Sequence, residues 1–184
     1  YSTNRVAISD AVFLNFSPVA WAPLTANSDH VHSGFVGEFA YNTSVARELL
    51  QGLGYSDTDG DGNLELEGNP LEIKVLVPSW GQLPQVAQIL RDQWRTVGIN
   101  LIIEPAPGLN SLIARIATGN YNLVAFDNFG VDPVLLNRMF VSTSPENLSQ
   151  YVNDDFDSLL LRATVERDPR TRLSLYYQIQ TTIM

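Results

Sequence analysis

Acidic residues at alternate positions have the residue type and spacing to bind a metal ion. Asp57, Asp59 and Asp61 precede Gly62 in the stretch DTDGDGNLELEGNP. This is the spacing of a loop that wraps oxygen ligands around calcium while a glycine makes the sharp bend. The twelfth position, where an EF-hand loop needs a bidentate glutamate, is Gly68. A calcium site and a connecting turn rich in Asp and Gly therefore both fit this stretch.

A second feature is the stretch FDNFGVDP, which combines aromatic, acidic and amide side chains after a predicted strand. Open α/β sheets bind ligands outside the carboxyl ends of their strands, where aromatic rings give apolar contact and polar groups give anchoring. Packing of Phe126 in the core, Trp80 as a loop anchor and capping of the next helix by Asp132 are the alternatives. The predicted ligand-binding residues are Trp80, Phe126, Asp127, Asn128, Phe129 and Asp132.

Groups for catalysis are scarce in this sequence. It holds two histidines, His30 and His32, no cysteine and no G-x-S-x-G motif, so a nucleophile paired with a base is not predicted. The neighbouring acids Asp154 and Asp155 lie in the opening turn of a predicted helix, where they oppose the helix dipole. We therefore expect no enzyme activity and no cofactor apart from calcium at the acidic turn.

Composition narrows the class of partner. The chain has 184 residues, 45% of them hydrophobic, which is enough for the core of one sizeable domain. Its net charge of -9 disfavours nucleic acid, because a nucleic-acid-binding protein brings Lys and Arg to the phosphates. Its first and last residues lack the signals that begin and end a chain, so we expect a piece of a longer protein.

Hydrophobic periodicity predicts the elements that must position these residues. Strand, helix, strand, helix, strand is the expected order of the core, and the short crossovers favour parallel pairing. The predicted fold class is a single three-layer α/β domain over 1–184, with a mixed, mostly parallel sheet, an irregular first segment over 1–42 and a regular core over 43–184. The predicted strands are 71–77, 99–105 and 121–126, and the predicted helices are 43–53, 83–97, 109–119, 153–166 and 168–180.

Three longer stretches carry a family resemblance. YNTSVARELLQGLGYSDTDGDGNLELEGNPLEIKVLV, ILRDQWRTVGINLIIEP and YNLVAFDNFGVDPVLLNRMF, followed by YVNDDFDSLLLRATVERDPRTRLSLYYQIQ, resemble in order and spacing the C-terminal lobe of family 5 extracellular solute-binding proteins. The resemblance covers roughly 41–184. In peptide-binding relatives the cleft loop is similar to GW-x-x-D, whereas Phe126 stands at the tryptophan and Phe129 at the aspartate here. Asp127 could take the place of that aspartate from another direction, so this departure leaves a sugar, a metal complex or an unusual peptide open.

The resemblance implies a function and partners. It implies one lobe of a type II periplasmic-binding-protein-like fold that captures a peptide, oligosaccharide or nickel complex for an ABC importer, without catalysis. The implied partners are the solute, a membrane permease and the N-terminal lobe of the same protein. The implied location is extracytoplasmic, in the periplasm or lipid-anchored at the cell surface. The rival hypothesis is a calcium-dependent structural or adhesion module built on the Asp57–Asp61 turn.

Overall fold

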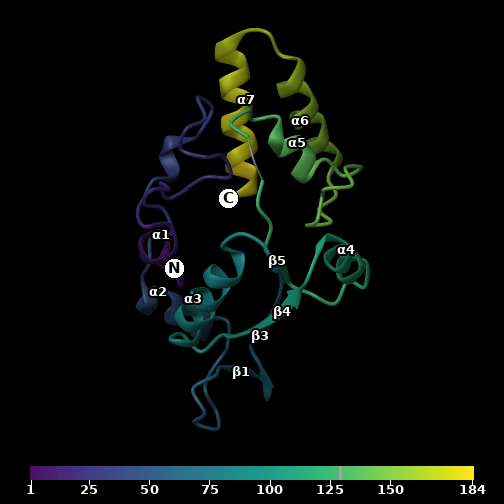
Figure 1. The fold of residues 1–184 in the computed structure, drawn as a ribbon. Coiled ribbons are helices and arrows are strands. Elements are labelled where there is room, and N and C mark those ends of the chain that lie inside the picture. Colours follow the sequence, from purple (N-terminus) through teal and green to yellow (C-terminus); the bar gives the residue numbers. More distant parts are fainter. Residues whose placement is uncertain (129) are drawn as a thin grey trace. The chain divides into compact units, whose positions relative to one another are not determined.

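The chain forms two compact units. The structure is a computed structural model that describes residues 1–128 and 130–184 (Figure 1). The first unit comprises Tyr1–Ser17 and Phe39–Asp127, and the second comprises Pro18–Glu38 and Asn128–Met184. The predicted division after residue 42 does not coincide with these units, because the first segment contributes to both of them. Within the described residues, no helix combines the length and the apolar character needed to cross a membrane.

A parallel sheet forms the centre of the first unit. Its strand order is β4-β3-β5, with β3 (Glu72–Pro78) hydrogen-bonded to β4 (Asn100–Ala106) on one side and to β5 (Leu123–Val124) on the other. β5 is shorter than the predicted strand 121–126. Oδ1 of Asn122 accepts a hydrogen bond from the N–H of Lys74 at 2.8 Å. At the start of the pairing, a side-chain oxygen thus replaces a backbone carbonyl as the acceptor.

Helices cover both faces of this sheet, because successive side chains of a strand point to opposite sides. Val75 and Val77 pack with Ala87 of α3 (Leu83–Arg95), whereas Leu76 packs with Leu112 of α4 (Leu109–Ala117). α2 (Thr43–Gly52) and α1 (Arg5–Phe13) complete the helices of this unit. The layered α/β fold class predicted from the sequence is therefore confirmed.

The second unit is helical. It contains a short 3-10 helix, η1 (Ser33–Phe35), then α5 (Leu135–Phe140), α6 (Asp154–Val165) and α7 (Pro169–Ile183). α6 and α7 lie side by side (Figure 1) and bury Leu160 against Tyr176 in one apolar cluster. Leu24 from the first segment joins the same cluster.

One buried amide ties the first segment to α7. Gln180 is fully buried, and its Nε2 donates to the carbonyl oxygens of His30 at 2.8 Å and of Tyr176 at 2.9 Å. Its Oε1 accepts the backbone N–H of His32 at 3.1 Å. The backbone N–H and C=O groups of an irregular segment have no neighbouring strand to bond with. The side chain of Gln180 provides hydrogen-bond partners for two of them instead.

We predict that Gln180→Leu lowers the free energy of unfolding by about 2–3 kcal/mol, because it leaves the N–H of His32 and the carbonyl of His30 without this partner. Urea denaturation followed by circular dichroism measures the loss. Gln178→Leu, at an exposed position of the same helix, is the matched control and is expected to change stability by less than about 0.5 kcal/mol. Equal effects of the two substitutions would contradict the role of Gln180.

Candidate functional site

The carboxyl ends of β3 and β5 meet at one edge of the sheet, since the two strands are parallel neighbours. Beyond the ends of the strands, the N–H of Ser79 donates to Ala106 at 3.0 Å and the N–H of Ala125 donates to Leu76 at 2.8 Å. These bonds hold the first residues of both loops close to the sheet. The edge has the position in which open α/β sheets bind ligands.

Trp80 and Asp127 are joined at this edge. The indole Nε1 of Trp80 donates to Oδ1 of Asp127 at 2.9 Å. The Trp80 ring packs against the cluster of Leu76, Ala106 and Leu112, so the core fixes the direction of the indole N–H. A carboxylate has about four lone-pair sites, and one hydrogen bond leaves Asp127 with acceptor capacity for a solute. The structure thus brings together two of the predicted site residues.

Phe126 lies next to this pair in the chain and remains 40% exposed. An exposed aromatic ring beside a half-buried indole and a carboxylate is the combination of apolar surface and polar anchor found in small-molecule sites. The alternative in which Phe126 is a core residue does not fit this exposure.

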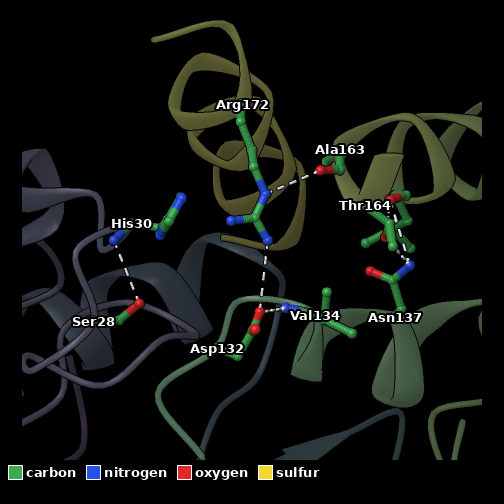
Figure 2. Close-up of polar contacts among 9 residues, drawn as sticks. Ser28, His30, Asp132, Val134, Asn137, Ala163, Thr164 and Arg172 are labelled. Atoms are coloured by element: carbon green, nitrogen blue, oxygen red, sulfur yellow. Dashed lines mark hydrogen bonds and ion pairs between the residues drawn. The ribbon is translucent and has the colours of Figure 1, made fainter. Parts of the chain in front are cut away.

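Asn128 and Asp132 belong to the second unit. Asn128 begins its second segment, and Phe129 lies outside the described residues. Asp132 accepts the N–H of Val134 at 2.9 Å, and its Oδ1 lies 3.7 Å from Nη2 of Arg172 (Figure 2). Sequence reasoning missed Arg172 as a partner of this loop, because only folding brings α7 to Asp132. The available signal was the D-x-x-x-R pattern that leads into the last helix and ends at Arg172.

The acidic turn is built as a hydrogen-bonded loop. Asp57 accepts the N–H of Gly60 at 2.8 Å and that of Gly62 at 3.1 Å, and Asp59 accepts the N–H of Asp61 at 3.1 Å. The chain then enters β1 (Glu65–Leu66), which pairs antiparallel with β2 (Asn69–Pro70). A hairpin in place of a second helix confirms that the turn is not an EF-hand.

Metal-ligand chemistry is also compatible with this turn. One carboxylate oxygen from each of Asp57, Asp59, Asp61 and the buried Glu65 lies within 4.8 Å of the others. Hard oxygen donors of this kind suit calcium. The Glu65 carboxylate, however, accepts the N–H and the hydroxyl of Thr58 at 2.7 and 2.8 Å. Calcium at the turn therefore stays a prediction from the sequence.

Asn63 lowers the pKa of one carboxyl in the turn. Its backbone N–H, and after it its side-chain amide, donate to Asp61 and lower the pKa of that carboxyl. A carboxyl whose pKa is depressed in the folded state stabilises the fold above its ordinary pKa of about 3.9. This contribution is lost as the pH falls through the lower pKa of the folded state.

Comparison with protein families identifies one match. The model of the bacterial extracellular solute-binding proteins, family 5 Middle, matches residues 1–149. No protein among curated sequences matches the chain.

Solved structures of similar fold hold chemically different molecules. The oligopeptide-binding protein AppA from Bacillus subtilis, in complex with a nonapeptide, is 21% identical over 99% of this chain and 37% of its own, with a TM-score of 0.80. NikA from Brucella suis, in complex with Fe(III)-EDTA, is 21% identical over 99% of this chain and 38% of its own, with a TM-score of 0.83. A periplasmic oligopeptide-binding protein from Thermotoga maritima, with mannohexaose bound, is 19% identical over 100% of this chain and 37% of its own, with a TM-score of 0.80.

These likenesses establish the fold. The chain spans a little over a third of the length of each of these three proteins. The sheet and its flanking helices thus match one part of these larger proteins.

We predict that Asp57→Ala lowers the free energy of unfolding by about 1–2 kcal/mol in buffer with EDTA, because Asp57 accepts two backbone N–H groups of the turn. Urea denaturation measures the change. Asp59→Ala, which removes one such bond, is the graded control and should cost about half as much. If neither substitution affects stability without calcium, the turn does not depend on these hydrogen bonds.

Proposed function

Because this chain belongs to the bacterial extracellular solute-binding proteins of family 5, we propose that it captures a peptide or related small solute for an ABC-type importer and performs no catalysis. Under this proposal the protein is located outside the cytoplasm. The partners are the solute, the membrane permease and the rest of the receptor, including its N-terminal lobe. The calcium-dependent adhesion module has no support from the family match or from the similar structures.

The observation that carries this proposal is the Trp80–Asp127 hydrogen bond at the carboxyl edge of the sheet. Recognition of a solute is tighter when its contacts are already in place, because ordering a side chain costs free energy at the moment of binding. The core holds Trp80, and Trp80 in turn holds Asp127. An anionic group that needs no reorganisation is suited to an amino group or another cationic part of a solute.

Phe126 and the indole of Trp80 extend this anchor with apolar surface. Aromatic rings accept the hydrophobic side chains of a peptide and also the apolar faces of sugar rings. The ligands of similar structures, a nonapeptide and mannohexaose, fall in these two classes. The carboxylate of Asp127 favours the peptide in our proposal, because a neutral sugar does not need an ionic partner.

One part of a receptor is expected to bind its solute weakly. Small-molecule sites bury most of the ligand surface, and a cleft between two lobes does so only when both lobes are present. The full-length protein that contains this chain is therefore the right material for binding experiments.

We predict that Asp127→Asn weakens binding of a cationic peptide about 10- to 100-fold, since a hydrogen bond to a charged group contributes about 1.5–3 kcal/mol. Isothermal titration of the full-length protein against short peptides, the same peptides acetylated at the amino terminus, oligosaccharides and nickel complexes measures it. Trp80→Phe keeps a ring but removes the N–H, and we expect a loss in the same direction. Asp10→Asn, an exposed acid of the same unit, is the matched control.

Three results would count against parts of this proposal. An affinity unchanged in both Asp127→Asn and Trp80→Phe would place the solute elsewhere while leaving the family intact. A cognate oligosaccharide or nickel complex would replace the peptide as the solute. Binding by no member of the panel would contradict capture of these solute classes.

A further inference from the structure

The loop that enters α5 is attached to α7 by charge. Asp132 caps the turn before α5 through the N–H of Val134, and the same oxygen, Oδ1, lies 3.7 Å from Nη2 of Arg172 (Figure 2). Pro133 follows and is buried, so the chain is held by packing on one side of the capped turn and by the ion pair on the other. All these groups belong to the second unit.

Arg172 is ordered by contacts that do not involve Asp132. Its Nε donates to the carbonyl of Ala163 on α6 at 3.3 Å, and its guanidinium carbon lies 5.3 Å from the centre of the Tyr176 ring. The Arg172 side chain is 26% exposed, whereas that of Asp132 is 72% exposed. An exposed pair contributes little when both side chains must be ordered to form it, but here the cation is already in position. The ion pair therefore restrains mainly Asp132 and its loop, because Asp132 is the more exposed of the two residues.

Buried polar atoms of side chains lie in the same helical bundle. Among the described residues, the buried Oδ1 of Asn137 accepts no hydrogen bond, and the buried hydroxyl of Tyr176 has none of normal geometry although Arg172 and Thr164 lie near it. Burial raises the pKa of Tyr176, and Asn137 donates from its Nδ2 to Thr164 at 2.8 Å (Figure 2). Phe and Leu would fill these places without unmet polar atoms. Local departures from optimal packing of this kind concentrate where a structure serves function.

We propose that Arg172 is a positioning residue for the turn that leads from Asp132 into α5, and that it acts through Asp132. The sequence left two roles open for Asp132, contact with the solute and capping of the next helix, and the hydrogen bond from the N–H of Val134 agrees with the second. The effect on the loop stands by itself. Its consequence for solute affinity rests on the proposed function.

Hydrogen exchange of the full-length protein tests the anchor without any solute. Arg172→Met keeps the aliphatic packing and removes the charge, and we expect the amides of Val134, Leu135 and Leu136 to exchange about two- to fivefold faster. The interior amides of α7 should be unchanged. Arg170→Met, at an exposed position of the same helix, is the matched control and should leave the loop unaffected.

Asp132→Asn is the second variant and does not disturb α7. Its amide oxygen can still accept the N–H of Val134, so it isolates the charge from the cap. It should accelerate exchange as much as Arg172→Met, and the double variant should add nothing further, because both remove one interaction. Unchanged exchange in either single variant, additive effects in the double variant, or acceleration spread along α7 would each overturn the proposal.

Titration with the same panel of peptides, oligosaccharides and nickel complexes separates positioning from contact. If Arg172 positions the loop, Arg172→Met and Asp132→Asn weaken binding by a similar factor, about two- to fivefold. If Asp132 touches the solute, Asp132→Asn alone weakens it, and the positioning role in binding is wrong. Should no panel member bind, the proposed function fails, while hydrogen exchange still decides whether Arg172 anchors the loop.

Discussion

The parallel pairing of β3 with both β4 and β5 is the constraint on which the first unit depends. A central parallel strand is buried on both faces, so its side chains must pack against a helix on each side of the sheet. Val75 and Val77 pack with α3, and Leu76 packs with α4. The same pairing brings the ends of β3 and β5 to one edge. The hydrogen bond between Trp80 and Asp127 is therefore a consequence of strand order.

In the second unit, side chains of one helix hold neighbouring segments in place. Arg172, Tyr176 and Gln180 are spaced by four residues and so lie along one face of α7. Gln180 satisfies the backbone at His30 and His32, and Arg172 faces Asp132. Between them, Tyr176 buries its ring, and its hydroxyl has no hydrogen bond of normal geometry within the part of the chain that the structure describes. One face of α7 thus combines a hydrophobic core with attachment of two loops.

A receptor gains affinity when its binding groups are held before the solute arrives. The predicted solute-contacting stretch divides between the units, because Asp127 ends one and Asn128 begins a segment of the other. Each end has its own anchor. Asp127 is held by an indole that the core fixes, and Asp132 is held by a guanidinium that α6 and α7 fix. Within its own unit, each of these two side chains is held by groups of regular elements.

The order of strands and helices, the parallel sheet and the position of the loop after β5 followed from the sequence, because periodicity, caps and short crossovers are local signals. The strand after the acidic turn was predicted in the same way, from the alternation that follows Asn69-Pro70, whereas the short hairpin of β1 and β2 was not predicted. The partners of Gln180 and Asp132 were not predicted either, since they join positions 148 and 40 residues apart that nothing local relates. Which residues belong to which unit was likewise decided by packing, because a segment such as 18–38 gains its core contacts from helices more than a hundred residues away.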